Sequence, residues 1–176
     1  MRTLRGSTIW LAAMLVYLLF SAQRCGATPC ATSGQSQTSR WRVYIDREHH
    51  FCFRYPTSYA PTSHPKAGWR GPKLEDKKTG ANVEVRVMNE EFRPDALVRM
   101  APTGIDSPPE ALQIGKNTFR YYGPGGGGVT YADVYYFDLR GKILAIGFDG
   151  PYENDKTPTS DTKQIERKVL ESFQEF

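Results

Sequence analysis

The hexapeptide Phe51-Cys52-Phe53-Arg54-Tyr55-Pro56 alternates aromatic residues with Cys52 and Arg54. Because successive side chains of a β-strand point to opposite faces, its three aromatic rings share one face. Burial of three aromatic rings contributes strongly to stability, so we predict that this strand lies in the core. Pro56 lacks a backbone donor and is expected to end the strand.

A second β-prone run, residues 41–45, precedes this strand, and the polar residues 46–50 lie between the two. Two short strands joined by a polar turn are typical of a β-hairpin. We therefore predict that the folded domain begins with a hairpin over residues 41–56.

This polar turn, followed by an aromatic-x-Phe-x-Tyr-Pro strand, resembles the opening of domains of the PsbP family of photosystem II and the Mog1 family. Residues 170–176 are similar to the helix-then-strand "S-F-x-F" ending of those domains. The resemblance covers roughly residues 41–176, a size that suits one domain. It implies an antiparallel sheet flanked by helices, as in many bacterial exported proteins of unknown function. The matched motifs are core motifs, so no catalytic residue, photosystem role or ion is carried over.

The pattern of the remaining chain agrees with an α+β fold. Val83, Val85 and Val87 alternate with polar residues, as expected for a half-buried antiparallel strand. Strands are also expected near residue 74, over residues 111–122 and in a hairpin over residues 129–148. Strands with helices segregated from them indicate the α+β class.

Two helices are predicted. The first covers residues 93–100, with a proline in its first turn. The second is expected to begin at Asp161 as N-cap, with Gln164 completing a capping box. Its apolar stripe, which includes Ile165 and Val169, is expected to lie across the sheet.

The N-terminus has the pattern of an export signal. Arg2 and Arg5 precede an apolar run over residues 8–20, which has the length of a signal-peptide core. The run is shorter than the roughly 20 apolar residues that span a bilayer. Small residues at positions 25–27 predict cleavage after Ala27, so residues 1–27 are expected to form a signal peptide and the protein to be periplasmic or secreted, with an earlier cut at Ser21 or Ala22 as an alternative. Membrane attachment through an uncleaved leader is the alternative.

Polar residues 28–40 are expected to form a flexible linker to a single domain over residues 41–176. The formal net charge is +4, but three of the 23 basic residues lie in the leader, which leaves 20 basic residues against 19 acidic ones. This near-neutral balance argues against nucleic acid as a partner.

Cleavage after Ala27 leaves two cysteines, Cys30 and Cys52. In an exported protein such a pair is a candidate disulfide, and two independent thiols are the alternative. Cys52 is expected to face away from the aromatic side of its strand, toward the N-terminal segment. A bridge there would contribute about 3 kcal/mol by restricting the unfolded chain.

His49, His50 and Cys52 form the one cluster with metal-ligand residue types. A zinc site needs three or four ligands, so His64 or a distant carboxylate would have to complete it, and an oxidised Cys52 could not ligate. We interpret the cluster as a polar turn and predict no metal and no cofactor.

Aromatic residues are dense between positions 121 and 137. Strand propensity explains most of them as core. Tyr122 and Tyr136 fall on the polar side of their strands, and with Trp69 they are the candidate binding face for a partner or ligand.

Enzyme motifs give no catalytic assignment. Gly125–Gly128 lacks the Gly-Lys-Ser/Thr ending of a phosphate-binding loop, and no Gly-x-Ser-x-Gly elbow is present. Acidic pairs such as Asp133 with Asp138 could perform acid–base chemistry, but carboxylates this common usually serve solvation. We predict an exported, non-catalytic binding or assembly domain with an unidentified extracytoplasmic partner. The alternative is a small-ligand carrier or hydrolase that uses a cleft near Gly125–Gly128.

Overall fold

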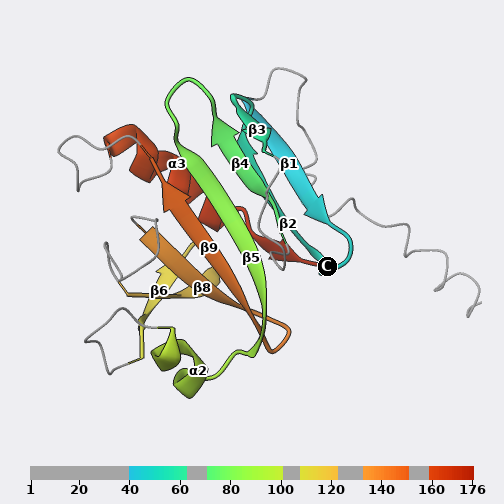
Figure 1. Ribbon diagram of the computed structural model, residues 1–176, viewed down its shortest axis with the longest axis vertical. Helices are drawn as coiled ribbons and strands as arrows, with labels where there is room; N and C mark the ends of the chain where they lie inside the picture. The colour runs from blue at the N-terminus through green and yellow to red at the C-terminus, as the bar shows by residue number, and fades with distance from the viewer. Residues whose placement is uncertain (1–39, 63–70, 101–107, 123–132, 151–158) are drawn as a thin grey trace, which may run out of the picture.

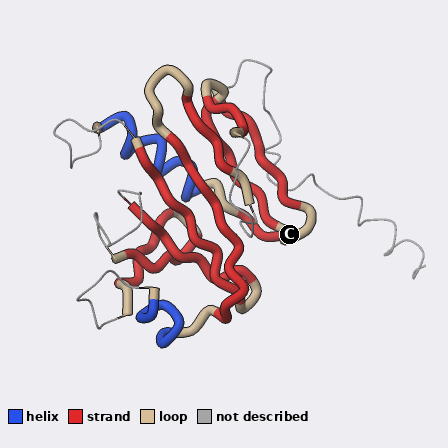
Figure 2. Tube along the Cα trace, in the orientation of Figure 1, coloured by secondary structure: helices blue, strands red, loops and turns tan. Residues whose placement is uncertain are grey.

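A computed structural model describes residues 40–62, 71–100, 108–122, 133–150 and 159–176. These parts of the chain form two antiparallel sheets and two helices (Figure 1). Figure 2 shows that strands make up most of this described chain.

The small sheet has the order β1-β2-β10 within the described residues. Its strands are β1 Trp41–Asp46, β2 Phe51–Pro56 and β10 Gln174–Glu175. The β1 and β2 strands pair in register from Asp46 opposite Phe51 to Trp41 opposite Pro56, so the predicted hairpin is confirmed. The two-residue β10 pairs with Phe51 and Cys52 on the other side of β2.

The large sheet has the order β3-β4-β5-β9-β8-β7-β6 in the described part of the chain. Its strands are β3 Tyr59–Pro61, β4 Lys73–Asp76, β5 Asn82–Glu91, β6 Glu110–Ile114, β7 Asn117–Tyr121, β8 Asp133–Leu139 and β9 Lys142–Asp149. The helices are α2 Pro94–Arg99 and α3 Ser160–Glu171. In Figure 1, α3 crosses the sheet, whereas α2 lies at the end where β5 finishes.

The main core lies between one face of the large sheet and the layer formed by β2 and α3. Phe51, Phe53 and Tyr55 of β2 are buried there, as their alternation predicts. They meet the three valines of β5 and the apolar stripe of α3, including Val169 and Leu170. Cys52 is also fully buried, and Cys30 lies outside the described residues, so their pairing stays a prediction.

The face of β5 opposite the valines is expected to be exposed to solvent, but two of its polar residues are buried. Asn82 and Glu84 are 7% and 2% exposed, although they alternate with the core valines. Arg86 Nε donates to Glu84 Oε1 at 2.8 Å, so an ion pair compensates part of the cost of burying this carboxylate. The expectation that both polar side chains face solvent is therefore wrong.

The N-cap of α3 is Thr159 and not Asp161. The Thr159 side chain accepts a hydrogen bond from the backbone N–H of Thr162, and its backbone is extended. Asp161 lies inside the first turn, where its negative charge interacts favourably with the helix dipole. The helix therefore begins earlier than the capping-box pattern predicts.

Gly71 has little room for a side chain. Its φ is +134°, and a Cβ atom there would lie 2.1 Å from the carbonyl oxygen of Val85. The carbonyl of the next residue, Pro72, accepts a hydrogen bond from Val85 N–H at 2.9 Å, so the two backbones are held together.

Gly71→Ala is therefore expected to lower the free energy of unfolding by about 3 kcal/mol, because an unfavourable φ and a backbone clash combine. The matched control is Gly80→Ala: Gly80 also has a positive φ, +77°, but a Cβ atom added there would have no neighbouring atom within 4 Å. That control should cost about 1 kcal/mol. If urea denaturation gave equal losses of unfolding free energy for the two variants, the clash with the Val85 carbonyl would be contradicted.

Candidate functional site

A groove opens where β1, β2 and the C-terminal end of α3 meet. It has a volume of about 330 Å³. It is lined by Trp41, Arg54, Lys168, Glu171, Ser172 and Gln174. This volume lies at the lower end of the range of ligand-binding pockets.

Backbone pairing and hydrogen bonds position the groove walls. Arg54 alternates with the core aromatics of β2, and its backbone N–H donates to Ser172 Oγ at 2.8 Å. The Ser172 hydroxyl in turn donates to the carbonyl of Val169 at 2.6 Å. Buried Asn117 donates through Nδ2 to the carbonyls of Leu170 and Phe173. The end of α3 is thereby fixed against β2 through Ser172 and against β7 through Asn117, which gives the groove a rigid wall.

The electrostatics of the groove are dominated by cations. Lys168 Nζ lies 5.8 Å from the centroid of the Trp41 ring, within the range of a cation–π interaction. The acidic residue of the lining, Glu171, forms an ion pair with Arg167 Nε at 2.9 Å. Arg54 adds a second cation to the lining. The groove therefore carries charged side chains of both signs beside the Trp41 ring.

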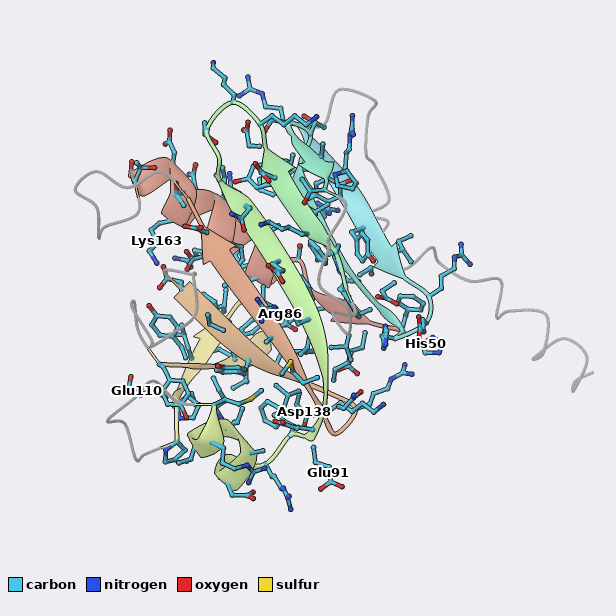
Figure 3. All side chains as sticks on the ribbon, in the orientation of Figure 1. His50, Arg86, Glu91, Glu110, Asp138 and Lys163 are labelled. Atoms are coloured by element: carbon cyan, nitrogen blue, oxygen red, sulfur yellow. The ribbon has the colours of Figure 1, made fainter. Side chains whose placement is uncertain are left out.

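A second polar cluster joins α3 to β7 and β8. Lys163 Nζ lies 2.6 Å from Asp133 Oδ2, and 3.3 Å and 3.2 Å from the two oxygens of Glu166. Tyr121 donates its hydroxyl to Asp133 Oδ1, and Tyr135 donates to Glu166 Oε1. Figure 3 shows Lys163 extending from α3 beside the sheet. We call these five residues the polar network.

Burial governs the protonation of the polar network. Burial raises the pKa of Glu166. It also raises the pKa values of Tyr121 and Tyr135, and the neighbouring carboxylates raise these two values further. Burial alone would lower the pKa of Lys163, but its contacts with Asp133 and Glu166 outweigh this and the pKa is raised. All four carboxylate oxygens accept hydrogen bonds within the network. This arrangement fastens the helix to the sheet.

Sequence reasoning finds only part of the polar network. It pairs Asp133 with Asp138 as a candidate acid–base couple, but Asp138 Oδ1 accepts from the N–H of Gly141 in the β8–β9 turn. It misses Glu166, which occupies the buried side of α3 with Val169 and Leu170. The place of Glu166 in that apolar stripe is the signal that could have found it.

The loop with Gly125–Gly128 lies outside the described residues. Tyr121 and Asp133 stand just before and just after that part of the chain and are hydrogen-bonded to each other. A ligand cleft beside these glycines stays a prediction.

The rings of Tyr122 and Tyr136, the candidate binding face, are less exposed than their place on the polar side of the strands predicts. Tyr136 is 6% exposed and packs with Leu97 of α2 and with Ile143, because α2 covers this face of the sheet. Tyr122 is half-buried, and its hydroxyl donates to the carbonyl of Leu97 at 2.7 Å. The expectation of an exposed Tyr136 ring is wrong, and Trp69 lies outside the described residues.

His49 and His50, which the sequence places beside each other, contact different partners in the structure. His49 Nδ1 lies 3.2 Å from Asp46 Oδ1, whereas the His50 ring meets the Phe176 ring edge-on. Figure 3 shows His50 at the turn between β1 and β2. Cys52 is buried, and His64 lies outside the described residues. Across the described ranges, no three His, Cys, Asp or Glu side chains are grouped to hold a metal ion.

None of the helices in the described parts of the chain combines the length and the apolar character needed to cross a membrane.

Comparison with known proteins identifies the fold. No protein-family model matches the sequence, and no curated protein matches it. The solution structure of cyanobacterial PsbP from Synechocystis is similar at a TM-score of 0.54 and 15% identity, over 84% of this chain and 99% of that chain. A crystal structure from Bacteroides thetaiotaomicron is similar at a TM-score of 0.53 and 11% identity, over 78% of this chain. This chain spans 49% of the Bacteroides protein. The chain has a PsbP-like α+β fold, which confirms the prediction from the hairpin and the ending.

Proposed function

We propose that the chain is an exported, non-catalytic domain that binds an extracytoplasmic protein partner through the groove at Trp41, Arg54 and Lys168. The observation that carries this proposal is the pairing of Lys168 with the Trp41 ring in a groove of about 330 Å³. Tryptophan and arginine, which both line this groove, are enriched among the residues that dominate the binding energy of protein interfaces.

The non-catalytic part of the proposal is supported by the polar network. It is the described cluster that most resembles an acid–base site, with two carboxylates, two tyrosines and a lysine. Its carboxylate oxygens are all occupied by partners within the network, and Asp133 and Glu166 are 1% and 3% exposed. A substrate would have to displace these contacts, so we assign the network to stability.

Export is supported by the signal-peptide pattern, and a PsbP-like fold is compatible with it. The proposal includes cleavage after Ala27, which releases the domain into the periplasm or outside the cell. It also includes a disulfide between Cys30 and Cys52, the two cysteines that such cleavage leaves.

The test is site-specific photo-crosslinking in the producing cells. A benzophenone side chain at position 164 is exposed on α3, one turn before Lys168, and a control at position 77 is exposed in the β4–β5 turn. We expect a discrete extracytoplasmic adduct from position 164 that disappears with Trp41→Ala and is absent from position 77. The same adducts from both positions, or none from position 164, would overturn the proposal.

A further inference from the structure

Strand β6, Glu110–Ile114, forms one edge of the large sheet within the described part of the chain. It pairs with β7 on one side, in a register that runs without a shift along the whole strand. Its first four residues are all exposed to solvent, and Figure 3 shows Glu110 at this edge. An exposed edge presents a row of backbone N–H and C=O groups with which another strand can pair.

The other edge strands in the described ranges have features that protect them from pairing. Strand β3 has three residues and ends at Pro61, β10 has two residues, and in β1 only Arg42 is exposed. By contrast, β6 contains no proline, no lysine or arginine and no bulge. Because short length, proline, cationic side chains and bulges are the usual protection of an edge, β6 is the described edge best suited to accept a further strand.

The turn that follows β6 determines which of its backbone groups point outward. Gly115 and Lys116 join β6 to β7 as a two-residue turn, with Gly115 at a φ of +60°. The residue before such a turn, here Ile114, forms a hydrogen-bonded pair with the residue after it, and hydrogen-bonded pairs then recur at every second residue. The backbone groups of the intervening residues, Ala111 and Gln113, therefore point away from the sheet.

These outward groups are complementary to an antiparallel copy of the same strand. With a two-fold axis at Leu112, Ala111 of one chain lies opposite Gln113 of the other, and such a pair exchanges both of its backbone hydrogen bonds. The Gln113 side chain is held within its own hairpin, since it donates to the carbonyl of Gly115 at 3.1 Å and accepts from the hydroxyl of Thr118 at 2.7 Å.

Leu112 places an apolar contact on the same axis. It is 37% exposed, although Phe119, its partner on β7, is fully buried in the main core. Across the axis the two Leu112 residues form a non-hydrogen-bonded pair, the arrangement in which opposite side chains approach most closely. Pairing of two copies therefore extends the core and covers an exposed leucine.

The charges near the ends of β6 also match a second copy. Glu110 at its start and Lys116 just after its end are both exposed, and neither forms an ion pair among the described residues. In the antiparallel arrangement Glu110 lies opposite Ile114, two positions before Lys116, and long side chains bridge this diagonal spacing. The two-fold axis repeats the pair, whereas a parallel copy would bring the two Glu110 carboxylates together.

We propose that β6 pairs with β6 of a second copy of this chain, antiparallel and centred on Leu112, so that the two large sheets join into one. An interface of one strand pair is small, so the dimer is weak and depends on protein concentration. It uses none of the residues that line the groove, so this inference is independent of the proposed function.

Sedimentation velocity of the exported protein over a concentration series tests the dimer. In the Leu112→Lys variant two cations face each other across the axis and the leucine contact is lost, so we expect dimerisation to weaken at least about tenfold. Phe176→Lys is the matched control, because Phe176 has a similar exposure of 39% and lies outside β6, and it should leave the dimer unchanged.

A cysteine variant tests the register without adding a charge. Opposite side chains of a non-hydrogen-bonded pair lie close enough for a disulfide, so mild oxidation of Leu112→Cys should give a covalent dimer that reductant dissolves. The unchanged protein and Phe176→Cys should not give this dimer. If circular dichroism shows that Leu112→Lys is unfolded, the Leu112→Cys crosslink decides.

A monomer at every concentration would overturn the inference and would leave the edge open to a strand of another protein. A dimer that Leu112→Lys and Phe176→Lys weaken equally, or that neither weakens, would overturn it as well. So would the absence of a covalent dimer of Leu112→Cys under conditions in which sedimentation shows the dimer.

Discussion

Phe173→Ala is expected to lower the free energy of unfolding by about 3 to 5 kcal/mol, the usual cost of removing a fully buried aromatic ring. Phe173 is 0% exposed, and its ring stacks on those of Phe53 and Phe51 at centroid distances of 4.7 Å and 6.1 Å. These contacts join the end of α3 to β2 across the core. The cavity left by alanine cannot close without moving the helix.

The matched control is Phe176→Ala, three residues later in the same ending. Phe176 is 39% exposed, and its loss should cost less than about 1 kcal/mol. Urea denaturation followed by circular dichroism gives both values from the midpoints, provided that the slopes agree. Losses of similar size at the two positions would show that the aromatic stack is not the centre of the core.

Lys163→Met is expected to cost about 2 kcal/mol near neutral pH. Breaking a fully buried ion pair costs about 3 to 5 kcal/mol, and the 43% exposure of the Lys163 side chain reduces that because water reaches its ammonium. The substitution keeps the length of the side chain but leaves the carboxylates of Asp133 and Glu166 without their cation.

The cost of Lys163→Met should depend on pH. The folded-state pKa of Glu166 is raised above its ordinary 4.5, first by burial, so ionising it in the folded protein lowers stability as pH rises through that window. Lys163 opposes this shift by its charge and its hydrogen bonds, so its removal raises the pKa of Glu166 further. The part of the difference that comes from Glu166 should vanish below pH 4.5, where Glu166 is protonated in both proteins, whereas the part that comes from the lost Lys163–Asp133 pair remains, so the total should be smaller at low pH and should grow toward neutral pH.

Denaturation at about pH 4 and about pH 7.5 measures this dependence. Lys168→Met is the control, because the Lys168 ammonium contacts the Trp41 ring, and its loss should cost less than about 1 kcal/mol at both pH values. A loss for Lys163→Met that is independent of pH would mean that packing, and not charge, sets the role of Lys163.

Local periodicity predicts most of the framework. The alternation of Phe51, Phe53 and Tyr55 places β2 in the core, and the valines of β5 identify its buried face. These predictions succeed because the side chains of a strand alternate by geometry, so one buried face is visible in the sequence. The ending that contains Phe173 is instead predicted from its resemblance to the helix-then-strand ending of PsbP-like domains.

Predictions that depend on what covers a face are less secure. The pattern of β8 puts Tyr136 on its polar side and predicts an exposed ring, but α2 packs over it. The pattern of β5 likewise predicts that Glu84 faces solvent, and it is buried beside Arg86. Periodicity separates the two faces of a strand, but it does not show which elements pack on each face.

The sequence by itself determined the hairpin, the apolar stripe of α3 and the α+β class, because each depends on residues a few positions apart. Only the tertiary structure decided the two polar sites. The polar network joins Glu166 to Tyr135, 31 residues earlier, and the groove joins Arg54 to Ser172 across 118 residues. Contacts at such separations depend on how the sheet and helix pack, and no local pattern of residues specifies that packing.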